Sequence, residues 1–161
     1  MCSSDLYEAL IRFALASGNA PALAEGMSLT LQVWPHNRLA LRVSAELLAL
    51  RGGALRGIAL LGRLVAEDPS DTDMQQALAT LQSHNDQMPA ALLTLEKATR
   101  SDPPPAVLVE QLARYYVRAG RRKDAAALAE RVRRAHPDEP EYAVVEADTF
   151  LELGRAADAH H

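Results

Sequence analysis

Cysteine is almost absent from this sequence of 161 residues, in which Cys2 is the only thiol. A single thiol cannot form an intramolecular disulfide, so the stability of the fold must come from packing. Aromatic residues account for only 4% of the chain, and no stretch alternates regularly between apolar and polar residues. β-Strands are therefore not expected.

Long apolar runs and a strong charge of one sign are missing as well. No stretch approaches the roughly 20 apolar residues of a membrane-spanning helix, and the first residues lack the basic and apolar regions of a signal peptide. The net charge of −4 creates no field that would attract nucleic acid or an anionic membrane. We expect one soluble domain over residues 1–161, and the sequence leaves open whether it lies in the cytoplasm, lies in the periplasm or is tethered to a membrane.

Proline is present at regular intervals, and this spacing is the main feature of the chain. Four prolines follow one another every 34 residues, at Pro35, Pro69, Pro103 and Pro137. A second set of turn-forming residues lies halfway between them, at Gly18, Gly52, Asp86, Gly120 and Gly154. Two kinds of turn residue thus share one period, which predicts a repeat architecture.

Each 34-residue unit is predicted to form a helix, a tight turn at the glycine position, a second helix and a proline-containing turn. The helices should be about 12 residues long. The predicted units span residues 4–37, 38–71, 72–105 and 106–139, with a partial fifth unit at 140–161. In the fifth unit Pro140 is expected in the first turn of a helix, and a turn at Gly154 would begin a second helix that ends early.

The unit resembles the tetratricopeptide repeat (TPR), whose pattern is W-x2-L-G-x2-Y, then A-x3-F, then P. The fourth unit carries this pattern best, at Val109, Leu112, Ala113 and Tyr116, then Ala125 and Ala129, then Pro137. The first unit is the loosest: Leu10 takes the leucine position, while the bulky Ile11 and Leu23 replace small residues. The resemblance implies an all-α fold, an α-solenoid in which antiparallel helix pairs stack into a right-handed superhelix.

The predicted last helix has no complete partner after it. Its apolar residues are Tyr142, Val145, Phe150 and Leu153. A two-helix unit cannot bury its apolar face alone, so we expect fraying, self-association into a homo-oligomer through this helix, or a continuation of the array. The chain stops at His161 without a C-terminal cap, and we expect it to be a segment of a longer protein.

In TPR proteins the first helices of the units line a concave groove that holds a peptide, so the resemblance implies a protein or peptide partner. The predicted contacts in this groove are Arg12, Arg42, Glu46, Gln76, Thr80, Glu110, Arg114 and Arg118. An alternative interpretation is that the pairs Glu8–Arg12, Arg42–Glu46 and Glu110–Arg114 only support their own helices. The lysine and asparagine clamp with which one TPR subclass grips chaperone tails is missing, so a chaperone-tail adaptor is not expected. Arg42, Arg114 and Arg118 remain candidates for contact with an acidic ligand.

A basic cluster contains seven of the 17 basic residues, at Arg118, Arg121, Arg122, Lys123, Arg131, Arg133 and Arg134. A nucleic-acid-binding patch has this composition. However, the last three lie at the end of a predicted helix, where cations interact favourably with the helix dipole, and Arg121 and Arg122 lie in a predicted turn. The second interpretation is favoured, and no nucleic-acid partner is predicted.

No catalytic residues, cofactor or metal site are predicted. No nucleophile with a base, phosphate-binding glycine loop or metal-ligand spacing occurs in a suitable structural context. Asp68, Asp71 and Asp73 suggest a calcium loop, but its central glycine and final glutamate are missing, so helix capping is the favoured interpretation. We do not expect an enzyme.

The sequence thus predicts an interaction module or scaffold that binds a segment of a partner protein. Two alternatives stay open. One is a regulatory or targeting segment of a larger enzyme, regulator or export and envelope assembly, and the other is a self-association module. The bias towards alanine, leucine and arginine favours a bacterial origin.

Overall fold

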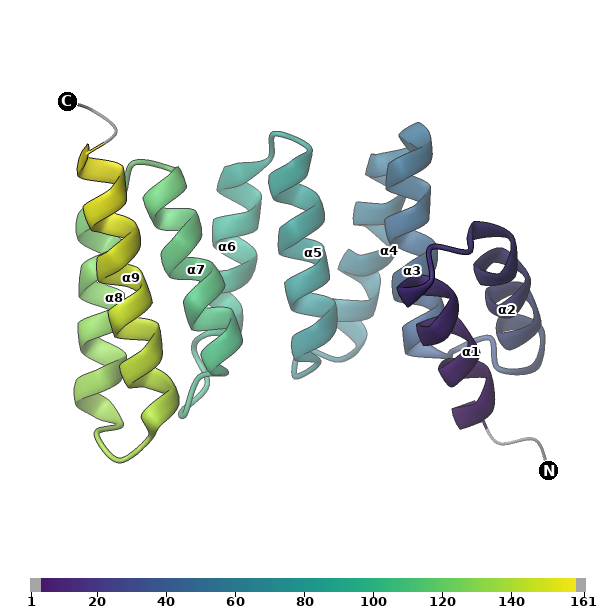
Figure 1. The fold of residues 1–161 in the computed structure, drawn as a ribbon, viewed down its shortest axis with the longest axis horizontal. Coiled ribbons are helices and arrows are strands. Elements are labelled where there is room, and N and C mark those ends of the chain that lie inside the picture. Colours follow the sequence, from purple (N-terminus) through teal and green to yellow (C-terminus); the bar gives the residue numbers. More distant parts are fainter. Residues whose placement is uncertain (1–3, 159–161) are drawn as a thin grey trace. The chain divides into compact units, whose positions relative to one another are not determined.

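The computed structural model describes residues 4–158, which form α-helices joined by short turns and contain no strand. Cys2, Ala159 and the two C-terminal histidines lie outside this range. The α-helices are shown in Figure 1: α1 (Ser4–Ala16), α2 (Ala20–Val33), α3 (Arg38–Leu48), α4 (Ala54–Glu67), α5 (Thr72–His84), α6 (Met88–Ala98), α7 (Ala106–Arg118), α8 (Arg122–Ala135) and α9 (Pro140–Asp158). Between α3 and α4 the segment η1 (Ala49–Gly53) contains a turn, because Arg51 and Gly52 have non-helical backbone angles. The predicted all-α class is confirmed. None of the described helices has both the length and the apolar character needed to cross a membrane.

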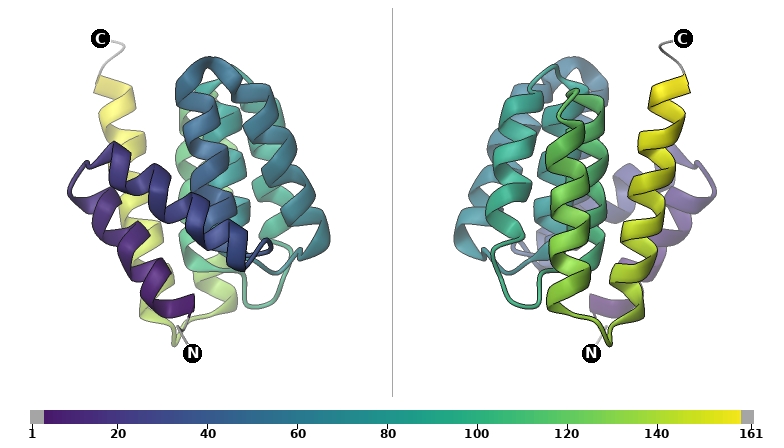
Figure 2. Two further views of the ribbon diagram at one scale, coloured as in Figure 1. Left: turned by 90° about the vertical axis from the view of Figure 1, so that its right-hand side faces the viewer. Right: turned by 90° about the vertical axis from the view of Figure 1, so that its left-hand side faces the viewer.

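The chain divides into two compact units, Met1–Arg63 and Leu64–His161, with the boundary inside α4. In the first unit α1 packs on α2, and both contact α3. In the second unit α5 pairs with α6 and α7 with α8, while α7 also contacts α6. The last helix, α9, lies antiparallel to α8 (Figure 2) and contacts α7 as well. Successive helices therefore pack on one another within each unit, as the predicted repeat of helix pairs requires.

The turns inside the helix pairs use the left-handed backbone conformation. Gly18, Gly52 and Gly120 have φ angles of 66°, 83° and 75°, a region that glycine enters without steric cost. Asp86, at the equivalent position of the third repeat, has a φ of 58°. Aspartate visits this region more readily than most residues do. The prediction that Asp86 takes the place of a turn glycine is therefore confirmed.

The predicted turn at Gly154 is wrong. Gly154 lies inside α9, which runs without interruption from Pro140 to Asp158. Glycine permits a turn but does not enforce one, and no second helix follows within the described range to hold a turn in place. Pro140 is the first residue of α9, as predicted, because a helix leaves its first N–H groups unpaired in any case.

Side-chain caps mark the start of three helices. Asn19, Asn37 and Asp71 each accept a hydrogen bond from the backbone N–H three residues later, at 3.1, 2.9 and 3.0 Å. A cap of this kind stabilises a helix by about 1 kcal/mol. Asp71 is one of the three aspartates considered as a calcium loop, and it caps α5 instead.

The larger apolar core belongs to the second unit and draws on α5 to α9. Ala79, Ala91, Ala113 and Ala125, which occupy the small-residue positions of the repeat pattern, are buried in this core. A hydrogen bond of 2.6 Å from the Tyr142 hydroxyl to the carbonyl oxygen of Pro104 connects α9 to the segment before α7.

The core of the first compact unit contains Ile11, Ala14, Leu23, Ala40 and Val43. The bulky Ile11 and Leu23 are both buried, so they fill volume at positions where the other repeats have small residues. Tyr7 of α1 and Trp34, which follows α2, meet edge to face, with ring centroids 5.3 Å apart.

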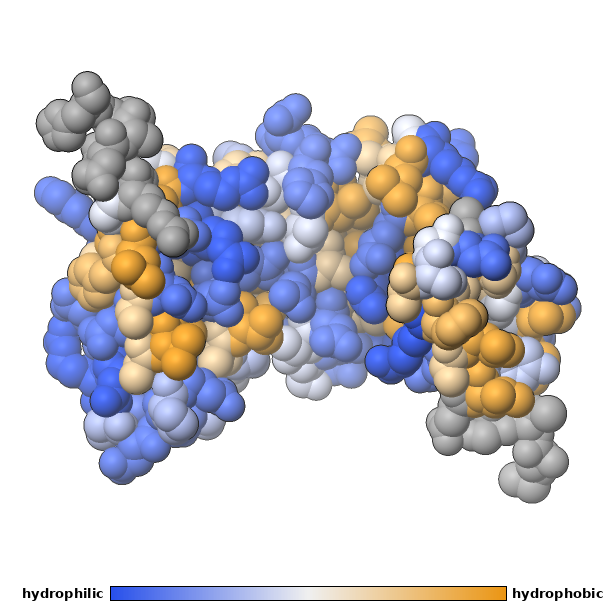
Figure 3. Space-filling view, viewed as in Figure 1, coloured by the Kyte–Doolittle hydropathy of each residue, from blue (hydrophilic) through white to orange (hydrophobic). Residues whose placement is uncertain are grey.

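An apolar stripe on α1 remains uncovered. The exposed fractions of Leu6, Leu10 and Phe13 are 56%, 50% and 72%, and Figure 3 shows an apolar patch over this helix. Leu112 occupies the same repeat position as Leu10 and is buried. Leu10 thus occupies the leucine position of the repeat pattern without being buried there. The reason is that α6 packs on α7, whereas no described helix precedes α1.

Candidate functional site

In the first compact unit, residues 1–63, the two arginines predicted to line the groove pair with acidic side chains on their own helices. Arg42 Nη1 lies 2.9 Å from Glu46 Oε1 on α3, and Arg12 lies 3.8 Å from Glu8 on α1. Glu8 also accepts a hydrogen bond from Asn37 Nδ2 at 2.8 Å. Exposed pairs at this spacing contribute a few tenths of a kcal/mol, so these contacts agree with the alternative interpretation of helix support.

In the second unit, Thr80 connects two neighbouring first helices of the repeats. Its hydroxyl accepts a hydrogen bond from Gln111 Nε2 at 2.8 Å, which joins α5 to α7. The same nitrogen donates to the Tyr115 hydroxyl at 3.1 Å. Gln111 Oε1 is buried and has no hydrogen-bond partner in the part of the chain that the structure describes. Gln76, about one turn before Thr80 on α5, is half-buried.

Arg118, at the end of α7, also contacts its own fold. Its Nη1 lies 3.4 Å from Ser83 Oγ on α5, and its guanidinium lies 5.6 Å from the ring centroid of Tyr115. Arg42 and Arg114 are paired with glutamates. All three arginines considered as contacts for an acidic ligand therefore already have intramolecular partners.

Glu110 and Arg114 line a cleft of about 190 Å3 between α7 and α9. The other lining residues are Val117, Asp148, Thr149, Leu151 and Glu152. Glu110 and Arg114 form an ion pair across one turn of α7. Three carboxylates and one guanidinium leave the cleft with a formal charge of −2. Val144 and Leu151, on α9, are 59% and 58% exposed, so apolar surface lies on the same helix as the negative charge.

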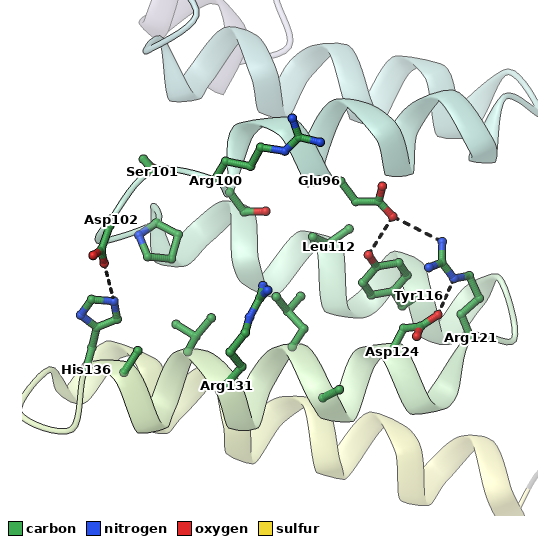
Figure 4. A pocket seen from close by; sticks show the side chains of 16 residues that line it. Glu96, Arg100, Ser101, Asp102, Leu112, Tyr116, Arg121, Asp124, Arg131 and His136 are labelled. Atoms are coloured by element: carbon green, nitrogen blue, oxygen red, sulfur yellow. Dashed lines mark hydrogen bonds and ion pairs between the residues drawn. The ribbon is translucent and has the colours of Figure 1, made fainter.

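A larger cavity of about 650 Å3 lies between α6, α7, α8 and the connector 99–105. One end holds a network of polar side chains (Figure 4). The Tyr116 hydroxyl donates to Glu96 Oε1 at 2.8 Å, and Arg121 Nη1 lies 3.4 Å from the same oxygen. Arg121 Nε lies 2.6 Å from Asp124 Oδ2, and the guanidinium stacks 4.4 Å from the centroid of the Tyr116 ring.

This network alters the proton affinity of Tyr116. The pKa of Tyr116 is raised to about 12, mainly by burial and also by the hydrogen bond to Glu96 and the negative charge of Glu96. The positive charge of Arg121 acts in the opposite direction. The pKa of Arg121 is itself raised, mainly by its hydrogen bond to Asp124. Tyr116 is therefore a neutral hydrogen-bond donor at physiological pH.

Most side chains of the predicted basic cluster make polar contacts within the protein, but those of Arg131 and Lys123 make none with the described residues. Arg122 Nη2 donates to the carbonyl oxygen of Leu153 at 2.6 Å, which ties α8 to α9. Arg133 Nη1 donates to the carbonyl oxygen of Pro137 at 2.5 Å, and Arg134 pairs with Glu130 at 3.0 Å. These contacts favour the interpretation of the cluster as helix-end and inter-helix support.

Comparison with proteins of known structure identifies the fold. No protein-family model and no curated protein matches the sequence. Solved structures do match: a Podosopora anserina putative kinesin light chain with nearly identical TPR-like repeats has a TM-score of 0.67 and 18% identity, with 99% of this chain and 92% of that chain covered. The chain has the TPR-like repeat fold.

The MamA protein is a second neighbour of this TPR-like chain, with a TM-score of 0.61, 17% identity and coverage of 97% of this chain and 85% of that chain. A MamA double mutant matches with a TM-score of 0.60 and 14% identity, over 98% of this chain and 96% of that one. At these identities the likeness is one of fold.

In this TPR-like chain the eight predicted groove residues are divided between the two compact units, with Arg12, Arg42 and Glu46 in the first and Gln76, Thr80, Glu110, Arg114 and Arg118 in the second. The structure brings Glu110 and Arg114 together in the cleft between α7 and α9, whereas Thr80 and Arg118 serve the packing of α5 on α7. Sequence reasoning missed the larger cavity and its residue Arg100, because Arg100 lies in a connector outside any recognisable pattern. No group of three metal-ligating side chains with suitable geometry occurs among the described residues.

Proposed function

We propose that this TPR-like chain is a protein-interaction scaffold and that the cleft between α7 and α9 binds a segment of a partner protein. The observation that carries the proposal is the combination of a formal charge of −2 in the cleft with exposed apolar side chains on α9. A segment with a cationic side chain beside apolar ones would satisfy both features. The proposal treats residues 1–161 as one repeat array without catalytic activity, because the same 34-residue period runs through both units.

The charged side chains of the cleft that remain unpaired determine which sign of charge the ligand should carry. The charge of Arg114 is neutralised by Glu110. Asp148 and Glu152, on α9, also line the cleft, and the lining contains no second cationic side chain to pair with them. An acidic segment would meet two carboxylates, and a basic segment would pair with them. The proposed partner segment is therefore basic and apolar, and the acidic ligand considered for Arg114 is not retained.

Fluorescence anisotropy with a capped, labelled peptide of alternating lysine and leucine tests this site. The double substitution Asp148→Asn and Glu152→Gln brings the charge of the cleft from −2 to zero and should weaken binding at least about tenfold. Glu25→Gln, which removes an exposed carboxylate from α2, is the matched control and should bind like the unaltered protein. Equal losses in both proteins would reject the cleft as the binding site.

Self-association through α9 is a second candidate function, and one observation favours it. Phe150 is 44% exposed, whereas Tyr116 at the same repeat position is 8% exposed and packed in the core. A second copy would cover this face. Light scattering across a concentration series should then show growth in mass that Phe150→Ser abolishes, and a constant monomeric mass would exclude this function.

A further inference from the structure

Two arginine side chains in the cavity between α6, α7 and α8 have no partner among the residues that the structure describes. Arg100, in the connector after α6, and Arg131, on α8, line this cavity and are exposed. Neither guanidinium group makes a hydrogen bond or an ion pair with any residue that the structure describes, although the backbone N–H of Arg100 donates to the carbonyl oxygen of Lys97. Figure 4 shows Arg131 reaching from α8 into the cavity and Arg100 on the opposite rim. Two guanidinium groups thus border one cavity without a counter-charge of their own.

The acidic residues of the same cavity are already engaged. Glu96 accepts the hydrogen bond of Tyr116 and lies beside Arg121, which also pairs with Asp124. At the other end, Asp102 Oδ1 lies 3.1 Å from His136 Nε2 (Figure 4). These two networks lie at opposite ends of the cavity, and the side chains of Arg100 and Arg131 lie between them (Figure 4).

The wall formed by α8 is apolar between these two networks. The lining residues of this wall are Ala127, Leu128, Val132 and Ala135, and Leu112 of α7 also lines the cavity. The cavity volume of about 650 Å3 falls within the range of sites that enclose a ligand or several side chains. A ligand that fits must therefore offer a carboxylate or a similar planar anion to the arginines and an apolar group to α8.

We propose that this cavity is a second recognition site, which binds a short acidic and leucine-containing segment of a protein through Arg100 and Arg131. Carboxylates match the fork geometry of the guanidinium group, and leucine side chains cover the apolar wall. A nucleic acid fits poorly, because its sugar–phosphate backbone offers no apolar side chain to cover the wall formed by α8. The site is separate from the cleft between α7 and α9 and takes a ligand of opposite charge.

Fluorescence anisotropy with a capped, labelled peptide of alternating glutamate and leucine tests the proposal on the whole chain. A matched peptide with glutamine in place of glutamate should bind at least about tenfold more weakly. Arg131→Gln should weaken binding of the acidic peptide about tenfold, and Arg100→Gln combined with it should reduce binding to background. Ala127→Trp, which fills the cavity without changing its charge, should also weaken binding.

Arg134→Gln is the control, because Arg134 belongs to the same helix but pairs with Glu130 and does not line the cavity. It should bind the acidic peptide as tightly as the unaltered protein does, and circular dichroism should show equal helix content in all variants. Equal binding of the two peptides, or equal losses in Arg131→Gln and Arg134→Gln, would overturn the proposal.

A titration with inorganic phosphate or succinate distinguishes a site for small anions. If either anion shifts the Arg131 Nε resonance while the peptide does not bind, the cavity is a site for small anions and the proposal is overturned. The variant Asp148→Asn with Glu152→Gln should keep its affinity for the acidic peptide, so a failure of either proposed site leaves the other intact.

Discussion

At the scale of single residues, Tyr116 shows how one buried side chain couples charge to stability. Its pKa is about 12 in the folded protein and about 10 in an unfolded chain. Between these values the unfolded chain has released the phenolic proton and the folded protein still holds it. The free energy of unfolding therefore falls as the pH rises through this window, and the contribution is fully present below pH 10.

The substitution Tyr116→Phe removes this proton and should flatten the alkaline part of the stability curve. Urea denaturation at about pH 9 and about pH 11 measures the effect, which is at most about 1.4 kcal/mol per pH unit. At neutral pH the variant should lose roughly 1–2 kcal/mol, because Glu96 loses its hydrogen-bond donor. Identical slopes in both proteins would show that Tyr116 titrates normally.

At the scale of elements, the attachment of α9 depends on Tyr142. Its hydroxyl is buried and donates to the carbonyl oxygen of Pro104, while burial raises its pKa. Tyr142→Phe should lower the free energy of unfolding by about 1–2 kcal/mol, because the carbonyl oxygen then lacks its donor. Tyr7→Phe is the control, since the Tyr7 hydroxyl makes no hydrogen bond within the described residues, and urea denaturation should show little change there. Equal losses in both variants would contradict the role of the bond.

The continuity of α9 leads to opposite expectations for two glycines of the same repeat position. Gly154 is helical and exposed, so Gly154→Ala should raise stability by about 0.5–1 kcal/mol. Gly120 has a φ of 75°, so Gly120→Ala forces alanine into a strained conformation and should lower stability by about 1 kcal/mol or more. Thermal denaturation of both variants distinguishes them. Destabilisation by Gly154→Ala would show that a turn forms there after all.

At the scale of the whole molecule, equal positions in the repeat do not have equal environments. Leu10 on α1 and Leu112 on α7 occupy the same position of their repeats, yet their exposed fractions are 50% and 2%. Leu112→Ala should therefore cost about 2–5 kcal/mol, and Leu10→Ala less than about 1 kcal/mol. Urea denaturation of the two variants measures the difference. Similar losses would mean that α1 is covered in solution, for instance by a second copy of the chain.

Much of the fold follows from local chemistry in the sequence. The prolines at intervals of 34 residues mark the ends of helix pairs, because proline removes an N–H group and restricts φ. Gly18, Gly52, Asp86 and Gly120 mark the turns inside the pairs, because few other residues tolerate a positive φ. These are properties of single residues, which is why the period alone predicts the order and the approximate length of the helices up to α8.

Packing between helices accounts for what the period does not contain. Gly154 has the same local character as Gly120 yet stays helical, because a permissive residue adopts whichever conformation its surroundings stabilise. Arg100 and Arg131 are 31 positions apart, and they meet at one cavity only because α6 and α8 both pack on α7. Glu110 and Asp148 come together in the same way through the contact of α7 with α9. Repetition in the sequence therefore specifies the helices and their turns, whereas the clefts, and the charges left unpaired within them, depend on how neighbouring helices pack.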